Sequence, residues 1–503
     1  MELINFKPRL YQENIVKTCR EKNTLVVLPT GTGKTSIALM LASDRLKKYP
    51  ESKVLITAPT KPLCSQHVQT FKQHSTIPGK ISLLTGAVSP EKRSEIWQSS
   101  IIIVATPQTI QSDLENSRIN LADVSMICLD ECHRSRQKYS NTFIIQEYLK
   151  HAKNQRILAL TASPGSSKER IEEIYKNLAI EAIEIRTETD EDIGPYVQEK
   201  NFELVAVELP SRLIELSSEL KKVHRNLLSK LKGLGYSKPA AVINKRDLLN
   251  LQQQFRSQLR YGNKMAFYGL SLVAQIIKLD HAITLIETQS IRALDNYLEK
   301  LSKEDTKAAR AIINDKSVAR VVSLTKEYAE NNLQHPKMEK IVWIIKREIQ
   351  NKETSRIIIF ANYRDIVSEI TKNLNDNNIK AVRFVGQADK EGDKGLKQKE
   401  QIEILQGFKN NEFNVLTASS IGEEGLDIPE VDAVVFYEPI PSELRKVQRV
   451  GRTGRTKPGK IIFLMAKKTI DEAYYWSSLR KEKKMKNILD KIKNREEVQA
   501  RLN

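Results

Sequence analysis

Short apolar runs without polar interruption occur in two separate parts of the chain, and they constrain its fold most strongly. From about residue 20 to 200 these runs alternate with helix-like stretches, and the same rhythm returns after about residue 335. Strands buried on both faces have this continuous pattern, which is typical of a parallel sheet covered by helices. The runs are 25–28, 54–56, 101–104, 126–129, 157–160, 357–360, 415–416, 434–437 and 461–464, and a further strand-like run at 382–385 is interrupted by Arg383. The sequence therefore predicts two α/β domains.

Residues 203–332 lack such runs and predict a different kind of structure. Apolar residues recur there at steps of three and four, which places them on one stripe of a long helix. They are Tyr268, Leu272, Ile276, Leu279, Ile283 and Ile286. We expect a first domain over 1–202, a helical insert over 203–332, a second α/β domain over 333–476 and a basic C-terminal helix over 477–503.

The charge balance favours a polyphosphate partner. The net charge is +19, although a solvated basic surface explains that value equally well. No stretch approaches about 20 uninterrupted apolar residues, and the start lacks a signal pattern, so we expect no membrane contact and a cytoplasmic location. The four cysteines have no metal-ligand or disulfide spacing, which predicts reduced thiols and no zinc.

Basic residues concentrate in the early part of the insert. Residues 221–264 contain eleven of them and a single acidic residue, Asp247. Such a run is either a solvated face or a nucleic-acid contact, and we favour the contact. The candidate residues are Lys221, Lys222, Arg225 and Lys230.

A glycine-rich segment after the first apolar run predicts a phosphate-binding loop. It consists of Leu28, Pro29, Thr30, Gly31, Thr32, Gly33, Lys34 and Thr35, and a helix-like stretch follows it. The glycines let successive backbone N–H groups point at phosphate oxygens, Lys34 neutralises the β- and γ-phosphates, and the Thr35 hydroxyl ligates Mg²⁺. Leu28 stands where the general motif has a glycine, and a chance glycine-rich turn is the alternative interpretation.

Two carboxylates end the run at 126–129, where α/β proteins bind ligands. Asp130 can hold Mg²⁺, partly through water, and Glu131 is the candidate general base for the attacking water. His133 is expected to sense the nucleotide. An acidic pair after a strand also serves as a cap, but the upstream loop favours catalysis.

Arginines near residue 450 predict the other half of the same site. A planar guanidinium stabilises the charge that develops in phosphoryl transfer. An arginine in this role, called an arginine finger, increases the rate of the reaction about 10³–10⁵-fold. Gly451 and Gly454 give the backbone freedom to bring Arg452 and Arg455 into a cleft. Although the run resembles a surface patch in isolation, the pairing with Lys34 predicts one ATP-Mg²⁺ site shared by two domains.

The ordered set of motifs resembles the superfamily 2 helicases. The motifs cover 10–12, 30–35, 58–62, 85–86, 105–108, 130–133, 161–163, 359–364, 417–428 and 448–455. The resemblance implies two RecA-like motor domains, an adenine contact for Gln12, and a role for Thr161 and Ser163 in coupling hydrolysis to domain movement. It also places Gly425, Asp427 and Gln448 at the nucleotide, with Asp427 on its ribose side. The implied contacts to a nucleic-acid backbone are Thr60, Lys61, Thr85, Gly86, Thr106, Asn362, Arg364 and Thr417.

The stretches 383–388, 422–432 and 471–476 look like the archaeal Hef helicases, which are related to the Fanconi-anaemia M translocases. This resemblance implies ATP-driven 3′-to-5′ movement on stalled forks and Holliday-type junctions in DNA repair, with branched DNA held by the insert. It further implies a monomer that associates with a prokaryotic nucleoid and with a nuclease or repair-protein partner. Hef-type proteins often carry a C-terminal nuclease, for which this chain has no room, so a truncated form and a nuclease-free form are both open.

Cys132 stands where Hef proteins usually have alanine, and the innate-immune sensors of double-stranded RNA often have cysteine there. Two alternatives therefore stay open. One is a double-stranded-RNA-dependent ATPase, and the other is a non-catalytic scaffold for branched DNA.

Overall fold

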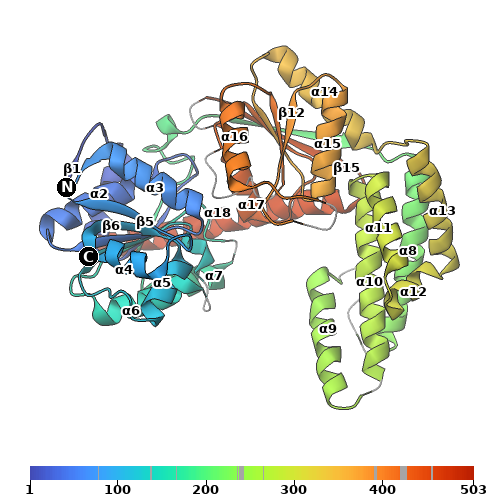
Figure 1. Cartoon of the computed structure of the whole chain (residues 1–503), viewed down its shortest axis with the longest axis horizontal. Helices are drawn as coiled ribbons and strands as arrows, with labels where there is room; N and C mark the ends of the chain where they lie inside the picture. The colour runs from blue at the N-terminus through green and yellow to red at the C-terminus, as the bar shows by residue number, and fades with distance from the viewer. Residues whose placement is uncertain are drawn as a thin grey trace.

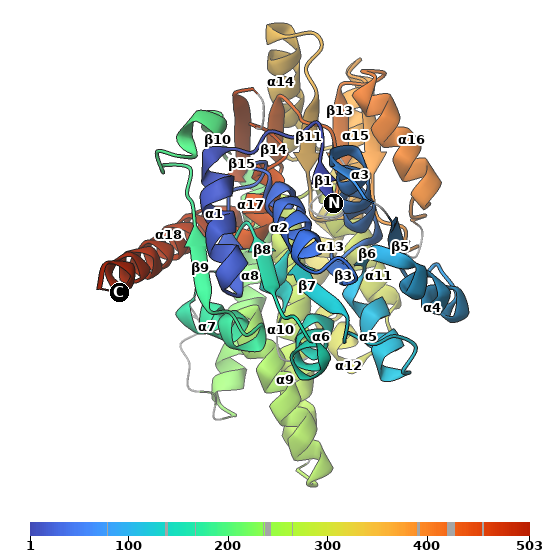
Figure 2. The same ribbon diagram turned by 90° about the vertical axis from the view of Figure 1, so that its left-hand side faces the viewer.

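A computed structural model shows two α/β domains joined by a helical bundle (Figure 1). The structure describes residues 1–77, 79–135, 139–165, 167–234, 236, 243–263, 265–389, 393–419, 428–454 and 457–502. The two predicted parallel sheets and the helical domain between them are confirmed. Figure 2 shows the bundle hairpin α9–α10 extending below both sheets.

The first sheet has seven strands in the order β5-β6-β3-β7-β8-β2-β9, and all described pairs in it are parallel. Its strands are β2 (Thr24–Val27), β3 (Lys53–Thr57), β5 (Lys80–Leu84), β6 (Ser100–Ala105), β7 (Val124–Leu129), β8 (Ile157–Thr161) and β9 (Ala182–Ile185). Its helices are α1 (Leu10–Glu21), α2 (Lys34–Lys48), α3 (Lys61–His74), α4 (Pro90–Ser99), α5 (Pro107–Glu115), α6 (Ser140–His151) and α7 (Lys168–Asn177). A two-stranded pair, β1 (Glu2–Leu3) with β4 (Ser75–Thr76), lies beside it. The edge strands β5 and β9 were missed because half of their residues are partly exposed, which removes the continuous apolar pattern.

The second sheet has six strands in the order β10-β15-β14-β11-β13-β12. Its strands are β10 (Lys200–Val207), β11 (Ile357–Phe360), β12 (Ala381–Phe384), β13 (Val415–Ala418), β14 (Ala433–Phe436) and β15 (Gly459–Ala466). Its helices are α14 (Pro336–Asn351), α15 (Arg364–Asp376), α16 (Gln398–Lys409) and α17 (Glu443–Val450). Strand β10 pairs with β15 along its whole length, so the expected boundary at residue 202 falls inside a strand of the second sheet. The chain therefore enters the second domain before it forms the bundle.

The bundle is built around α10, the apolar helix that the sequence predicted. Its helices are α8 (Ser211–Lys232), α9 (Lys245–Arg260), α10 (Met265–Thr288), α11 (Ile291–Lys303), α12 (Lys307–Ile313) and α13 (Lys316–Glu330). The predicted stripe from Leu272 to Ile286 is buried, and α10 contacts α8, α9, α11 and α12. By length and composition alone α10 also qualifies as a membrane span, a property that the central helix of a bundle shares.

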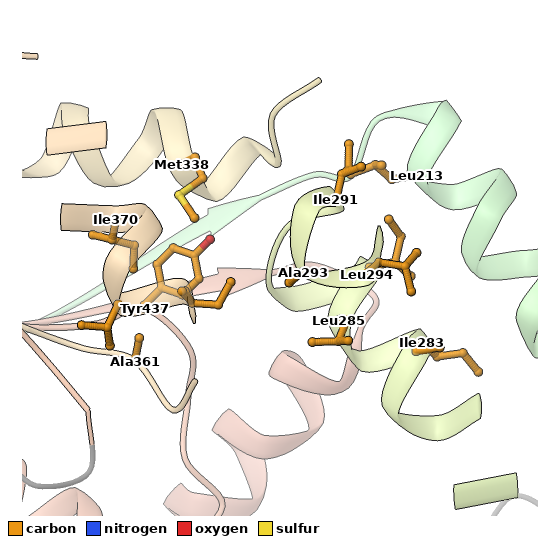
Figure 3. Close-up of a cluster of buried hydrophobic side chains, with 14 of the residues drawn as sticks. Leu213, Ile283, Leu285, Ile291, Ala293, Leu294, Met338, Ala361, Ile370 and Tyr437 are labelled. Carbon is orange, nitrogen blue, oxygen red and sulfur yellow. The ribbon is translucent and has the colours of Figure 1, made fainter. Parts of the chain in front are cut away.

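The bundle and the second sheet share one hydrophobic core (Figure 3). Met338, Ile370 and Tyr437 of the second domain belong to the same cluster as Leu285 and Leu294 of the bundle. Polar contacts reinforce this junction. The Tyr437 hydroxyl donates to the carbonyl of Gln289 at 3.0 Å, and Lys337 Nζ donates to the carbonyl of Thr288 at 3.1 Å. The bundle is thus packed as an extension of the second domain.

The last helix, α18 (Ile470–Leu502), connects all three parts of the molecule. It begins directly after the second sheet, and it contacts α17, β15, α10 and β9 (Figure 1). Met485 and Leu489 lie in the core of the first domain, and Lys493 Nζ pairs with Asp190 Oδ1 at 2.6 Å. The sequence predicted a basic helix from residue 477. The helix starts seven residues earlier and is amphipathic, with its apolar side on the first domain.

Truncating the apolar side of α18 should loosen its attachment to the first domain. Replacing Leu489 with alanine removes buried methyl groups, at a cost of about 2 kcal/mol. We expect faster amide exchange in residues 480–493, measured by hydrogen–deuterium exchange mass spectrometry. The control is Ile402→Ala at an exposed position on α16. If amide exchange in these residues were unchanged in Leu489→Ala, the packing of Leu489 would not be what holds α18 on the first domain.

Candidate active site

The glycine-rich loop between β2 and α2 forms a concave turn. Gly31 and Gly33 have φ values of 81° and 78°, which glycine adopts without strain. A Cβ atom added at Gly33 would lie 2.6 Å from Gln12 Nε2, so the side-chain-free position is required. Helix α2 starts at Lys34, and the positive end of its dipole faces the turn. This arrangement of backbone N–H groups fits the oxygens of a phosphate.

Residues at the start of α1 support the loop from outside. Gln12 is buried, and its Nε2 donates to the carbonyl oxygens of Thr32 and Gly33 at 3.3 and 3.4 Å. The Tyr11 hydroxyl also donates to the carbonyl of Thr32. Inside the loop, Thr32 Oγ1 donates to the carbonyl of Pro29 at 2.7 Å. Gln12 is therefore placed against the loop, where the sequence predicted a nucleotide contact.

Lys34 and Asp130 provide a cation and an anion beside the loop. Lys34 Nζ makes long contacts to the carbonyl oxygens of Leu28 at 3.4 Å and Pro29 at 3.5 Å. Asp130 Oδ2 lies 2.8 Å from His67 Nε2, and its Oδ1 accepts the N–H of Glu131 at 2.9 Å. Burial alone would raise the pKa of Asp130, but His67 and Lys34 hold it below its usual value. The carboxylate is thus ionised at neutral pH.

An ionised Asp130 suits a magnesium ion, which prefers oxygen ligands and keeps several waters. Thr35 follows Lys34 in the first turn of α2 and supplies a hydroxyl. No group of three or more acidic, histidine or cysteine residues that could hold a metal occurs among the described residues. A bound ion would therefore depend on Asp130, Thr35 and the oxygens of a phosphate ligand. His67 was not predicted, because only the tertiary fold brings α3 to the end of β7.

Glu131 begins a chain of contacts that leads away from the site. Its backbone has a φ of 51°, a conformation that residues with side chains rarely adopt and that occurs at functional sites. His133 Nδ1 lies 3.2 Å from Glu131 Oε2 and 3.1 Å from Thr161 Oγ1. Ser163 N donates to Thr161 Oγ1 at 3.1 Å, and Ser163 Oγ contacts Met485 Sδ of α18 at 2.9 Å. The candidate base is therefore connected to the helix that bridges the domains.

The two predicted halves of the site meet at Thr30 and Gly451. A Cβ atom built on Gly451 would lie 2.2 Å from Thr30 Oγ1, a separation that only a glycine permits. Gly451 is the C-cap of α17, which contains Gln448, and Arg452 follows it directly. Arg455, Gly425 and Asp427, which were also predicted here, lie outside the described residues. The structure thus brings the phosphate loop and the segment of Arg452 into contact across two domains.

The predicted nucleic-acid contacts of the first domain share one edge of its sheet. Thr60 follows β3, Thr85 and Gly86 follow β5, and Thr106 follows β6. These strands are neighbours, so the carboxyl ends of all three lie together. Lys61 and Gly86 are exposed. Thr60 Oγ1 is buried without a hydrogen-bond partner in the described part of the chain.

The predicted nucleic-acid contacts of the second domain are hydrogen-bonded to other protein groups or buried. Arg364 donates to the carbonyl oxygens of Ala388 and Gly386 at 2.6 and 3.2 Å. The Asn362 side-chain oxygen accepts from Arg449 Nη2 at 3.2 Å. Thr417 is fully buried in β13. A strand could contact Thr417 only after a rearrangement.

The basic surface of the insert is less one-sided than the sequence indicated. Lys221 Nζ pairs with Glu287 at 2.5 Å, and Lys222 Nζ pairs with Glu219 at 2.6 Å. Both carboxylates come from outside residues 221–264, so Asp247 is not the sole opposing acid. Arg225 Nε donates to the carbonyl of Lys221 at 3.3 Å, and Lys230 is exposed. Half of the predicted contact set is thus charge-compensated, while Lys238 and Lys264 lie outside the described residues.

A buried carboxyl group, Glu438, links the segment that follows β14 to the segment that follows β11. It follows β14 and accepts the backbone N–H of Asn362. Burial raises the pKa of Glu438 to about 7, although Lys337 and Arg449 oppose this effect and Asp471 adds to it. No local sequence pattern points to this residue, because its environment is assembled from α14, α17 and α18.

The raised pKa makes folding stability depend on pH in a defined direction. The folded state binds the Glu438 proton more tightly than the unfolded state, so this contribution is present below the ordinary carboxyl pKa and is lost as pH rises through about 7. Between pH 5 and 8 the free energy of unfolding of the wild type should fall by about 3 kcal/mol more than that of Glu438→Gln. Urea unfolding across this range tests the difference, with exposed Glu353→Gln as the control. Parallel pH profiles of Glu438→Gln and wild type would contradict the assignment.

Comparisons with protein families cover most of the chain. Residues 9–171 match the DEAD/DEAH box helicase family, and residues 337–457 match the helicase conserved C-terminal domain. Residues 212–332 match a family described as "Putative ATP-dependent RNA helicase, helical bundle". The three matches coincide with the first domain, the second domain and the bundle.

Several relatives align over nearly the full chain. The chain is 40% identical to the "Putative ATP-dependent RNA helicase" of Methanocaldococcus jannaschii over 96% of its length, and 33% identical to the ATP-dependent DNA helicase mph1 of Neurospora crassa over 91%. It spans 60% and 41% of those two proteins. It is also 33% identical to the DEAD-box ATP-dependent RNA helicase FANCM of Arabidopsis thaliana, of which it spans 35%.

Among solved structures, the Hef helicase domain of Pyrococcus furiosus is similar in sequence and in fold. The two share 47% identity with a TM-score of 0.72, and the match covers 94% of this chain and 98% of that domain. The fold, the order of the motifs and the near-complete coverage of the Hef helicase domain all indicate the same family. The chain therefore belongs to the superfamily 2 helicases, in the family of the Hef helicase domain.

Proposed function

We propose that the chain is an ATP-dependent helicase or translocase that moves 3′ to 5′ on forked or branched DNA in DNA repair. The contact between Thr30 and Gly451 carries this proposal, because it sets the phosphate loop of one domain against the arginine segment of the other. A site split in this way couples hydrolysis to relative domain movement. We further propose a cytoplasmic monomer that works with a nuclease or repair-protein partner.

In this proposal the first domain holds the triphosphate. Lys34 and the backbone of residues 28–35 bind its phosphates, and Gln12 contacts the adenine. Thr35 and Asp130 hold Mg²⁺, which neutralises phosphate charge when bound. Glu131 accepts a proton from the attacking water, and its Oε2 lies 3.2 Å from His133 Nδ1.

The second domain supplies positive charge to the same phosphates. Arg452 follows the contact with Thr30, and Gln448 precedes it by one helical turn. The proposal also assigns Arg455 to the phosphates, and Gly425 and Asp427 to the nucleotide, on family resemblance. A guanidinium stabilises the transition state only when the two domains are closed, so hydrolysis requires closure.

Movement along a strand follows from the way the parts are joined. The sheet edge of Thr60, Thr85 and Thr106 grips a backbone from the first domain. The bundle shares its core with the second domain, so an arm of branched DNA bound there is carried with that domain. Closure and opening then shift one grip relative to the other. Contacts of this kind go to phosphates and predict strong salt dependence with little sequence preference.

A second candidate function is supported by the names of the relatives. The M. jannaschii and A. thaliana proteins are described as RNA helicases, whereas the N. crassa protein is described as a DNA helicase. A double-stranded-RNA-dependent ATPase is therefore the alternative. A non-catalytic scaffold is disfavoured, because the residues 34, 130, 131 and 452 are all of the catalytic type.

ATP hydrolysis and strand displacement with matched substrates test the proposal. We expect forked DNA to stimulate hydrolysis more than double-stranded RNA of the same length, and ATP to drive separation of the fork. Glu131→Gln should lower turnover at least about 100-fold with little change in ATP binding, while exposed Glu51→Gln retains activity. Stronger stimulation by RNA would defeat the DNA assignment, and full turnover in Glu131→Gln would refute the general base.

The contact between the domains can be tested at Gly451. A valine there would overlap Thr30, so Gly451→Val should hold the cleft open and lower ATP turnover about 10- to 100-fold. Nucleotide binding to the first domain should persist, as measured with a fluorescent ATP analogue. Gly194→Ala is the matched control, because an added Cβ there meets nothing within 4 Å. Normal turnover in Gly451→Val would show that closure does not use this contact.

A further inference from the structure

The turn between α9 and α10 carries a group of exposed apolar side chains at the far end of the bundle. Tyr261 is 91% exposed, Phe267 is 68% exposed, Met265 is 60% exposed and Tyr268 is 46% exposed. Figures 1 and 2 show this hairpin projecting away from both sheets. Exposed apolar groups of this size usually mark a binding surface.

The turn is firmly held, although its side chains are free. Gly262 has a φ of 85°, and the N–H of Asn263 donates to the carbonyl of Gln258 at 3.1 Å. The N–H of Met265 donates to Asn263 Oδ1 at 3.0 Å. A Cβ atom at Gly269 would lie 2.7 Å from the ring of Phe255, so the two helices are closely packed just behind the turn. The described part of the turn therefore has a defined backbone that carries these exposed rings.

The charge of the hairpin is entirely positive around these rings. Residues 248–277 contain no aspartate or glutamate, whereas they contain Arg256, Arg260 and Lys264. Arg256 and Arg260 are exposed on the last turns of α9. This differs from Lys221 and Lys222, whose charges are compensated by glutamates. The surface is thus suited to a polyanion.

Few polyanions also offer flat apolar faces. In a duplex the base faces are stacked and covered, but in a single strand they are open to aromatic side chains, and each stacked base contributes about 1–3 kcal/mol. Arginines beside such rings bind the neighbouring phosphates and can stack themselves. A single-stranded nucleic acid therefore matches both the rings and the charge of this surface.

We propose that the hairpin tip, formed by Tyr261, Met265, Phe267 and Tyr268 with Arg256 and Arg260, binds unpaired bases in a single-stranded arm of a branched nucleic acid. This inference rests on the proposed function and specifies which part of the substrate the insert recognises. Because the bundle shares its core with the second domain, an arm held at the tip moves with that domain. The tip would thus distinguish a fork with an open arm from a continuous duplex.

Paired variants of the two most exposed rings test the proposal in the full chain. Tyr261→Ala with Phe267→Ala removes the rings, whereas Tyr261→Phe with Phe267→Tyr retains them. The first pair should bind a fork with single-stranded arms at least roughly 30-fold more weakly than wild type, and the second should bind normally. Affinity for a blunt duplex of equal length should change less than about twofold in both.

Photo-crosslinking locates the contact directly. A fork with 5-iodouracil in its single-stranded arm should crosslink to residues 256–268, and the crosslink should be lost in the alanine pair. Replacing Arg256 and Arg260 with alanine should reduce the magnitude of the salt slope by about 1.4, as expected for two phosphate contacts to a single strand.

The outcomes separate this proposal from the function on which it rests. If forks do not stimulate ATP hydrolysis by the wild type, the proposed function fails. If they do, but the alanine pair retains full affinity for the open arms, the rings serve another partner, such as a protein, and the tip proposal is wrong. Equal loss of affinity for open arms and blunt duplex would also overturn it.

Discussion

The close approach of Gly451 to Thr30 is the interaction on which the rest of the structure depends. The two residues belong to different domains and are separated by most of the chain, yet no side chain larger than hydrogen fits between them. Each half of the site is incomplete without the other. The first domain has the phosphate loop and the Asp130 carboxylate, and the second has Arg452. In the proposed mechanism catalysis depends on domain closure, because the charges that stabilise a transferred phosphoryl group are divided between two bodies.

Two further features join the domains and support the proposed coupling of closure to movement. The bundle is fused to the second sheet through a common core around Tyr437 and Leu285. Helix α18 connects the second domain to the core of the first domain, where Met485 contacts Ser163. Ser163 is connected through Thr161 and His133 to Glu131. The helix that spans the domains thus reaches the neighbourhood of the candidate base.

The sequence predicted the parts of the structure that have local signals. Central strands such as β7 and β8 are continuous apolar runs, and the loop at Gly31 and Gly33 has the spacing of a phosphate site. Edge strands such as β10 were missed because their exposed residues interrupt the run. Long-range partners were missed for a different reason. His67 and Glu438, and the glutamates that compensate Lys221 and Lys222, become neighbours of the site or of the basic patch only after folding, and no spacing in the sequence encodes them.

The most direct test is a structure of the protein with a non-hydrolysable ATP analogue and Mg²⁺. We expect Lys34 and Arg452 to contact the same triphosphate from opposite sides, with Thr30 and Gly451 still in contact. A complex in which the nucleotide binds the first domain alone, while Arg452 faces away and no closed form exists, would contradict a shared ATP site.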